Sequence, residues 1–151
     1  MAQLDPTNLD AAALGDEFEE AIRDTIARVE RLDSAKAREG WSRTELLGHL
    51  LDSACNNHQR FVRAALDGEY RGPGYEQERW VALQGYAEME WGELFALWRS
   101  LNLHLARIVR RIPPESLTAV CHVGAYDPMT LEELVRDYVV HLRHHLRQME
   151  A

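Results

Sequence analysis

The chain has few features of membrane, secreted or nucleic-acid-binding proteins. None of its apolar runs approaches the ~20 residues that a membrane-spanning helix requires. The first ten residues, MAQLDPTNLD, hold neither a basic segment nor an apolar one, so no secretion signal is recognised. We therefore expect a cytoplasmic protein that has no membrane partner.

Positive charge is in deficit. Lys and Arg number 17 against 25 Asp and Glu, which gives a formal net charge of −8. This balance disfavours partners dominated by phosphate, such as duplex DNA or an anionic membrane surface, because their charge would repel the chain. We expect a small-molecule substrate and no nucleic-acid partner.

Cysteine is also scarce. The two cysteines, Cys55 and Cys121, are expected to be free thiols in a reducing compartment rather than a disulfide. Two thiols alone cannot form a zinc site. A disulfide framework is therefore not expected.

What the chain does have is helical periodicity. Its 151 residues suit one domain, expected over residues 1–151, and 46% hydrophobic against 28% charged residues is an ordinary globular balance. Four long stretches repeat apolar residues at helical spacing. The first runs from about residue 9 to residue 38, before Gly40, and its apolar face is Phe18, Ile22, Ile26 and Val29.

The second stretch opens on a capping box, Ser42-Arg43-Thr44-Glu45, which predicts a helix that runs to about Asp67 and stops at Gly68. Next come the residues GEYRGPGYEQERW (68–80), whose glycines and proline predict a loop without regular structure. A short helical turn is expected near residues 76–83.

The third stretch, about 88–112, ends at Pro113-Pro114. The fourth begins near Thr130 with a second capping box, TLEE, and reaches about Met149. The pattern predicts an all-α four-helix bundle with one long connection, roughly 68–87, between its second and third helices. Loops of that length are often functional.

Histidines concentrate in the last helix, within DYVVHLRHHLRQ (137–148). At ~100° per residue, His145 is expected near the middle of the core-facing stripe, His141 at its edge and His144 in solvent. Histidines four residues apart share a helix face, so His141 and His145 can bind one ion, or can be a hydrogen-bonded structural pair. The stripe itself is Leu131, Leu134, Val135, Tyr138, Leu142 and Met149.

A polar stripe on the second helix favours the metal interpretation. It consists of His49, Ser53, Asn56 and Arg60. Asn57 falls near the centre of the apolar face of this helix, and Asn102 falls within the apolar stripe of the third, where an amide is costly unless it is paired. These positions indicate a polar pocket inside the bundle. His49 would complete a triad with His141 and His145.

These segments resemble a known family. GWSRTELLGHLLDSACNNHQRF, YEQERW and TLEELVRDYVVHLRHHLRQ look like the DinB-like superfamily, in particular its YfiT-like branch, over roughly residues 40–148. The resemblance implies an up-down-down-up four-helix bundle, often a homodimer. It also implies a divalent metal, commonly zinc or nickel, on three histidines, here His49, His141 and His145.

The resemblance also implies chemistry. Relatives include thiol S-transferases that use bacillithiol, mycothiol or glutathione, and a mycothiol-dependent isomerase. Three neutral imidazoles leave a metal with an open position, which suits either a cosubstrate thiol or a hydrolytic water. No carboxylate base stands at a motif position, so we favour S-transfer. The alternatives are a metal-dependent hydrolase and a non-catalytic metal-binding stress-response module.

Further residues are candidates for supporting roles. Asp137, four residues before His141, is expected to orient that imidazole. Apolar residues beyond the main stripe of the second helix, Val62 and Leu66, favour a homodimer. The candidate pocket residues are expected either to contact substrate or only to bond neighbouring helices together: Ser53, Asn56, Asn57 and Arg60. Tyr75 and Trp80 are expected to cover the pocket.

Overall fold

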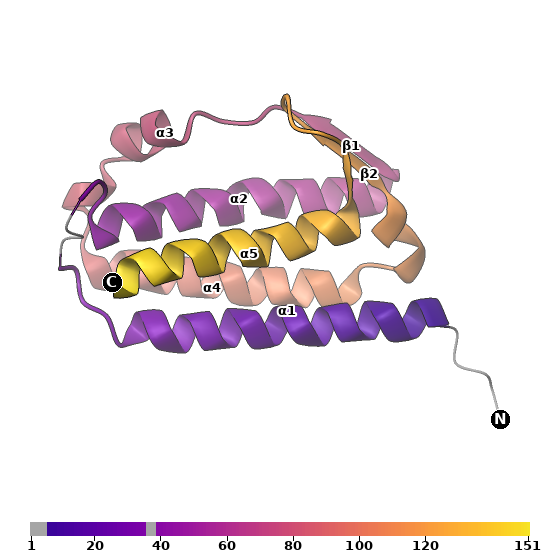
Figure 1. Ribbon diagram of the computed structural model, residues 1–151, viewed down its shortest axis with the longest axis horizontal. Coiled ribbons are helices and arrows are strands. Elements are labelled where there is room, and N and C mark those ends of the chain that lie inside the picture. The colour runs from indigo at the N-terminus through magenta and orange to yellow at the C-terminus, as the bar shows by residue number, and fades with distance from the viewer. Residues whose placement is uncertain (1–5, 36–38) are drawn as a thin grey trace.

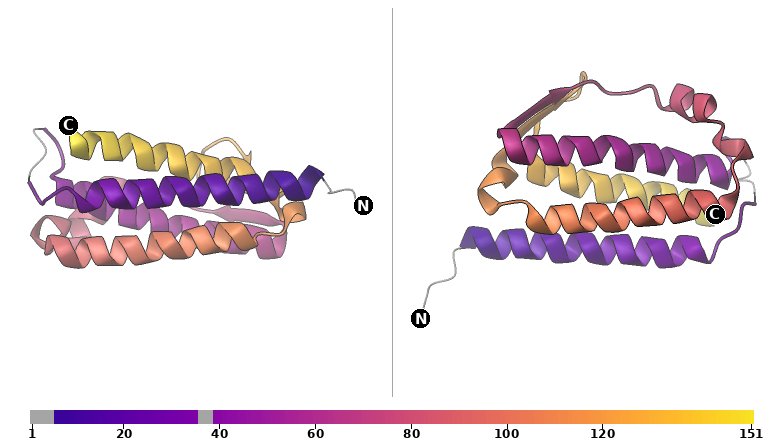
Figure 2. Two further views of the ribbon diagram at one scale, coloured as in Figure 1. Left: turned by 90° about the horizontal axis from the view of Figure 1, so that it is seen from below. Right: turned by 180° about the vertical axis from the view of Figure 1, so that it is seen from behind.

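Four long helices lie side by side in the computed structural model, which describes residues 6–35 and 39–151, with side chains from residue 10 onward (Figure 1). Helices α1 and α2 each pack against both α4 and α5. Helices α1 and α5 run in one direction and α2 and α4 in the other, so the order is up-down-down-up (Figure 2). The predicted four-helix bundle is confirmed. Its helices are α1 (Pro6–Glu30), α2 (Arg43–Asp67), α4 (Trp91–Arg111) and α5 (Leu131–Glu150).

Local signals set the ends of α2 and the start of α5, as the sequence predicts. The Ser42 hydroxyl accepts from the Glu45 amide at 3.2 Å, and the Glu45 carboxylate accepts from the Ser42 amide at 3.1 Å. Thr130 and Glu133 form the same reciprocal box before α5. Gly68 ends α2 with φ of 77°, a left-handed conformation that suits glycine.

Helix α1 is shorter than predicted. It ends at Glu30 rather than near residue 38. The Asp33 carboxylate accepts a hydrogen bond from the Ala35 amide at 3.0 Å, and such local bonds compete with the helical pattern. Residues 36–38, the end of the predicted helix, lie outside the described residues.

The connection after α2 is more regular than predicted. Residues 69–72 form strand β1 (Glu69–Gly72), which pairs in parallel with β2 (Val120–Val123). Strand β3 (Met129–Thr130) completes a small sheet in the order β1-β2-β3. The prediction of irregular structure was wrong here because β1 is stabilised by a distant partner, which local glycines and prolines do not reveal. The expected helical turn is confirmed as α3 (Gln77–Gln84).

The long connection follows from the topology. Because α2 and α4 are parallel, the chain must return along the ~37 Å length of α2 before α4 can begin. The return passes over α2 through β1, α3 and the short 3-10 helix η1 (Tyr86–Glu88) (Figure 1). A buried carboxylate anchors it: Asp52 accepts from the Tyr86 hydroxyl at 2.7 Å and from the Gln84 amide at 2.9 Å.

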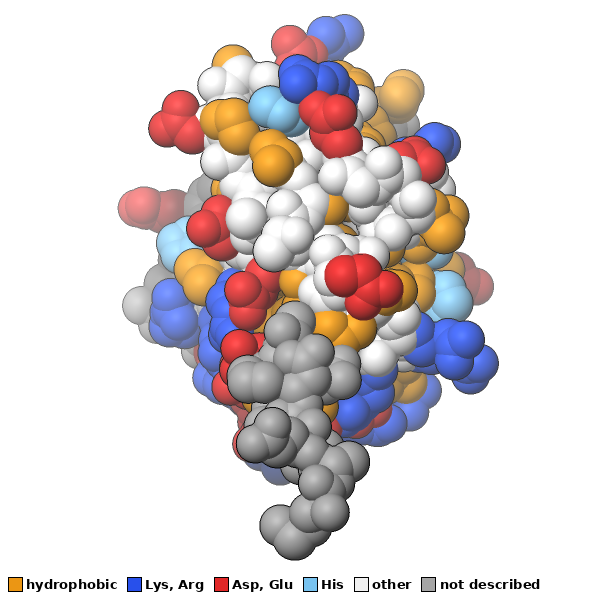
Figure 3. Space-filling model, turned by 90° about the vertical axis from the view of Figure 1, so that its right-hand side faces the viewer, with side chains coloured by type: hydrophobic (Ala, Val, Ile, Leu, Met, Phe, Trp, Pro, Cys, Tyr) orange, Lys and Arg blue, Asp and Glu red, His pale blue; other side chains and the backbone are white. Residues whose placement is uncertain are grey.

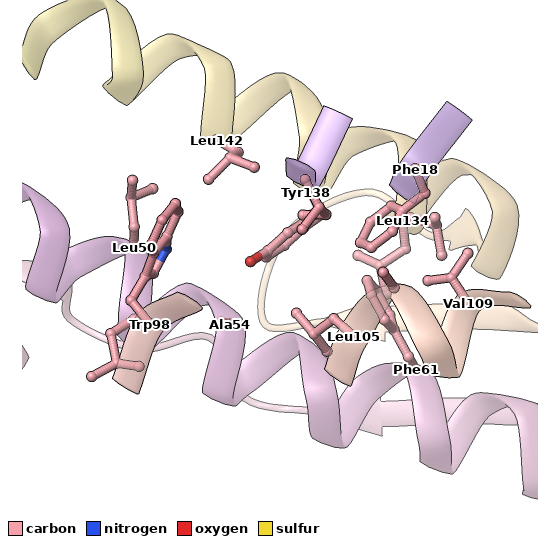
Figure 4. Packing of buried hydrophobic residues seen from close by; sticks show 14 of the residues in the cluster. Phe18, Leu50, Ala54, Phe61, Trp98, Leu105, Val109, Leu134, Tyr138 and Leu142 are labelled. Carbon is pink, nitrogen blue, oxygen red and sulfur yellow. The ribbon is translucent and has the colours of Figure 1, made fainter. Parts of the chain in front are cut away.

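The bundle core is aromatic at its centre. Rings from three helices meet there, with Phe18 on α1 next to Phe61 on α2 and Tyr138 on α5 (Figure 4). The Tyr138 hydroxyl donates to the Asn102 side chain at 2.5 Å, and Asn102 donates in turn to the Trp98 carbonyl at 2.8 Å. Asn102 is thus paired within the core and does not mark a pocket, unlike the expectation from the sequence.

The surface at the sheet end of the bundle, near η2 (Pro114–Thr118), mixes acidic, basic and apolar side chains on the visible face (Figure 3). Among the described residues, no helix combines the length and apolarity that a membrane crossing requires. Leu66 is 79% exposed, which is compatible with the expected homodimer, and that expectation stays a prediction.

We predict that Gly48→Ala destabilises the protein by about 1–3 kcal/mol, the usual cost of an overpacked core. A Cβ at Gly48 would lie 2.2 Å from the Tyr86 ring, so the anchored return segment would have to move. Gly15→Ala is the matched control, because there the nearest atom, 3.2 Å away, belongs to the flexible Arg110 side chain. Urea unfolding of both variants checks this, and equal stabilities would contradict it.

Candidate metal centre

Three histidines from two helices converge on one point. His49, in the second turn of α2, is fully buried, whereas His141 and His145 on α5 are half-buried. The Nε2 atom of His141 lies 3.1 Å from Nε2 of His49 and 3.1 Å from Nε2 of His145. One ligand atom from each residue lies within 4.8 Å of the other two. The structure therefore brings together the three histidines named from the sequence, while His144 is exposed.

The three rings surround this point without stacking. Their planes are inclined at 78°, 83° and 81° to one another, so each presents an edge nitrogen rather than a face. The Trp41 ring lies 5.0 Å from the His49 ring, centroid to centroid. Trp41, just before α2, is thus an aromatic neighbour of His49.

The position of His145 differs from the prediction. His145 does not lie in the middle of the apolar stripe of α5; Leu146, 1% exposed, occupies that place. His145 lies beside the stripe, as His141 does, and both keep partial contact with solvent. The sequence assignment failed because omitting Leu146 shifted the apparent centre of the stripe toward His145. The pair therefore opens the cluster to the surface.

Burial keeps the cluster neutral. It lowers the pKa of His49 to about 3, with a smaller contribution from the neighbouring charges of His145 and His141. It lowers the pKa of His141 to about 4, again with help from His145 and His144. The pKa of His145 is also lowered, chiefly by burial. All three imidazoles are thus uncharged at neutral pH, the form in which histidine binds metals.

The donor set fits a divalent cation. Four ligands at ~2.0–2.1 Å in a tetrahedron lie about 3.3 Å apart, close to the 3.1 Å from Nε2 of His141 to Nε2 of His49 and of His145, and all three ligand atoms lie within 4.8 Å of one another. Without a cation, Nε2 of His141 faces two other ring nitrogens and can share at most one proton with one of them. A cation would instead accept a lone pair from each ring.

An outer partner fixes one of the rings. The Nδ1–H group of His145 donates to the Gln148 side chain at 2.7 Å, which leaves the Nε2 lone pair directed at the cluster. The sequence reasoning missed Gln148, although its position three residues after His145 places it on the same helix face. Asp137 is exposed and makes no hydrogen bond to His141 among the described residues, so its orienting role stays a prediction.

A cavity of about 320 Å³ adjoins His141, between α2, α5, the return segment and the β2–β3 turn. Four of the predicted pocket residues line it: Ser53, Asn57, Arg60 and Tyr75. Within the cavity wall, the Asn57 amide donates to the Ser53 carbonyl at 2.9 Å. Asp137 also lines the cavity.

Two predicted pocket residues are placed elsewhere. Asn56 donates to the Asp52 carbonyl at 2.9 Å, and Trp80, 39% exposed, packs against the Tyr75 ring; neither lines the cavity. Conversely, Cys121 and Tyr126 line it although the sequence reasoning did not select them. They come from the β2–β3 region, whose pairing with β1 carries no local sequence signal.

The fold and the site together describe a helical bundle protein with a candidate metal centre. Its features are four long helices, a long crossover and three converging histidines. The family model of the DinB superfamily matches residues 17–149, and the chain belongs to that superfamily. No curated protein sequence matched the chain.

Solved structures share this fold. YfiT from Bacillus subtilis, described as a probable metal-dependent hydrolase with an unusual four-helix bundle topology, superposes with a TM-score of 0.79 at 18% identity, over 99% of this chain and 88% of that one. A mycothiol-dependent maleylpyruvate isomerase superposes with a TM-score of 0.74 at 14% identity, over 95% of this chain and 61% of that one. The predicted YfiT-like architecture is confirmed.

We predict that the metal-free protein loses stability as the pH falls below about 6.5. The folded pKa values of His49 and His141, about 3 and 4, lie below the ordinary 6.5 of an unfolded chain. Between these values the unfolded state binds more protons, so the contribution is complete above pH ~6.5 and is lost as the pH falls, down to pH ~4 for His141 and pH ~3 for His49. Urea unfolding of chelator-treated protein at several pH values measures the slope.

The matched variants for this slope are His141→Gln and His144→Gln. Removing the buried His141 should flatten the pH dependence, whereas removing the exposed His144 should leave it nearly unchanged. Identical slopes in both variants would show that the buried cluster is not the source of the effect.

Proposed function

We propose that this chain is a metal-dependent enzyme that holds one divalent metal, zinc or nickel, on His49, His141 and His145. We further propose that it transfers a low-molecular-weight thiol, of the bacillithiol, mycothiol or glutathione type, to an electrophilic small molecule. The convergence of three neutral imidazoles, with Nε2 of His141 3.1 Å from Nε2 of each of the other two, beside a cavity carries this proposal. The mycothiol dependence of one structural neighbour, a maleylpyruvate isomerase, supports the thiol part.

The chemistry needs an activated nucleophile and a place for its partner. A divalent metal on three imidazoles lowers the pKa of a bound thiol or water, so that it deprotonates near neutral pH. In S-transfer the thiol sulfur forms a bond to carbon, the leaving group departs with its electron pair, and the thiol proton passes to solvent. The cavity beside His141 offers a place for the electrophile.

The environment of Asp52 supports thiol transfer over hydrolysis. Hydrolysis usually employs a carboxylate as general base, and Asp52 is the buried carboxylate nearest to His49 along α2. Its oxygens already accept hydrogen bonds from Tyr86 and Gln84, so it serves the return segment instead. A thiolate needs no such base, since it brings its own nucleophilicity.

Asp137 supports a second candidate function. This exposed carboxylate lines the same cavity as His141, one turn away on α5, where it could act as a general base in hydrolysis. The description of YfiT as a metal-dependent hydrolase agrees with this alternative. A non-catalytic metal-binding module is the outcome if neither reaction occurs.

We predict that His145→Ala abolishes tight metal binding while His144→Ala leaves the metal content at one per chain. Loss of a ligand should weaken affinity by more than the roughly hundredfold cost of losing an outer partner. Elemental analysis and competition with a chromogenic chelator measure both variants. The two residues are adjacent on α5, so equal metal loss would contradict the assigned site.

The reaction can be assigned with two substrates. We expect metal-loaded protein to accelerate conjugation of glutathione, mycothiol or bacillithiol to monobromobimane, and to leave p-nitrophenyl acetate unhydrolysed when no thiol is present. At saturating metal, Asp137→Asn should change thiol conjugation little, because no base is required. Ester hydrolysis that falls by about 10²–10⁴ in Asp137→Asn would instead establish the hydrolase.

A further inference from the structure

Arg60 is a buried cation without a protein partner. It lies on α2 in the wall of the cavity, is 8% exposed, and forms no ion pair or hydrogen bond with any described residue. This is unusual for a chain with 25 acidic and 17 basic side chains, where carboxylates are in surplus. Four other arginines form ion pairs with carboxylates: Arg28, Arg43, Arg110 and Arg136.

A buried guanidinium is costly when it stands alone. Most of the Arg60 side chain is buried, but its guanidinium nitrogens are not among the fully buried unpaired atoms, so its N–H groups are open to the cavity and can donate to a ligand there. A ligand anion in the cavity can supply the opposite charge and the acceptors that the protein does not. The planar fork of arginine matches the two oxygens of a carboxylate, which it binds through two parallel hydrogen bonds.

The same cavity adjoins both this cation and the histidine cluster. His141 and Arg60 both line it, so one small molecule can reach both. The Cα atoms of His49 and Arg60 are about 16 Å apart along the axis of α2, at ~1.5 Å per residue. Side chains on a helix lean toward its N-terminus, which is the direction of His49 from Arg60.

The neighbours of Arg60 suit an anion. Burial raises the pKa of Tyr75 to about 12, and the charge of Arg60 only partly offsets this, so the Tyr75 hydroxyl stays protonated and can donate a hydrogen bond. Asp127 and Asp137, which also line the cavity, are exposed. Their negative charges repel ligands that carry several negative charges. A ligand with a single carboxylate, bound at Arg60, is therefore favoured over a polyanion.

We propose that Arg60 is the anion-recognition residue of this site, and that the substrate or thiol cosubstrate carries a carboxylate that pairs with Arg60 while its reacting end lies at His49, His141 and His145. The inference rests on the proposed function only for the location of the reacting end. The cavity, at about 320 Å³, falls at the small end of the ~300–1,000 Å³ range of ligand sites. A small organic acid therefore fits better than a large conjugate.

The first experiment measures binding of mercaptopropionate, mercaptohexanoate and mercaptooctanoate to zinc-loaded protein by calorimetry. Each is compared with its primary amide, which has the same length but no charge. We expect the acid to bind at least about tenfold tighter than the amide at one preferred length, a difference typical of a charge-assisted pair. In Arg60→Met the acid and the amide should bind alike.

Arg63→Met is the matched control. It removes the same charge from the exposed side of α2, where Arg63 contacts Gln59, and should keep the preference for the acid. Arg60→Lys keeps the charge but loses the fork, and should retain only part of the preference. If Arg60→Met unfolds, and Arg60→Lys binds acid and amide equally, then Arg60 is structural and the inference is wrong.

A second measurement does not depend on the metal. The Nε–H signal of Arg60 in ¹⁵N-labelled, metal-free protein is followed by NMR during titration with hexanoate, and is assigned by its absence in Arg60→Lys. A saturable shift of this signal, with no shift in the Arg63 signal, supports the anion site even if thiol conjugation fails. An unmoved Arg60 signal, together with equal binding of acids and amides, overturns the inference while leaving the metal site standing.

Discussion

The packing of α2 against α5 is the constraint on which the site depends. The two helices are antiparallel, so the N-terminal half of α2, with His49, faces the C-terminal half of α5, with His141 and His145. Core residues under the cluster, among them Leu50 and Leu142, hold this register (Figure 4). A shift of one helical turn between the two helices would move a ring by about 5.4 Å, and the three histidines would no longer meet at one point. Close packing of apolar side chains is therefore what places polar nitrogens 3.1 Å apart.

The direction of α4 shapes the rest of the site. Because α2 and α4 are parallel, the chain must cross the outside of the bundle, and this return passes over α2. The buried bonds from Asp52 to Tyr86 and Gln84 attach the return to the same helix that carries His49. Gly48 allows that attachment, since only a residue without Cβ lets the Tyr86 ring lie so close. The connection thus encloses a cavity against the part of α2 that carries Ser53, Asn57 and Arg60.

Local signals in the sequence were sufficient for most of the bundle and for the histidine pair on α5, whereas His49 was joined to that pair through the polar stripe of α2 and the family resemblance. Capping boxes at Ser42 and Thr130 place helix starts through contacts within four residues, and the spacing of His141 and His145 is likewise local. Features that depend on distant partners could not be derived in this way. Strand β1 exists through pairing with β2, and the residues that the β2–β3 region adds to the cavity follow from it. The end of α1 and the central place of Leu146 were local errors of pattern assignment.

One face of α2 carries residues at both ends of the site. His49 belongs to the histidine cluster, Arg60 lies farther along the cavity wall, and Ser53 and Asn57 between them bond to each other. A helix held by a packed core is a rigid spacer, so the distance between the cluster and the guanidinium is set by the backbone rather than by mobile loops. Specificity for ligand length then follows from the fold itself. The return segment, attached to the same helix at Asp52, encloses the cavity without setting that distance. Changes in the return segment should therefore alter access to the cavity more than the length of ligand that it accepts.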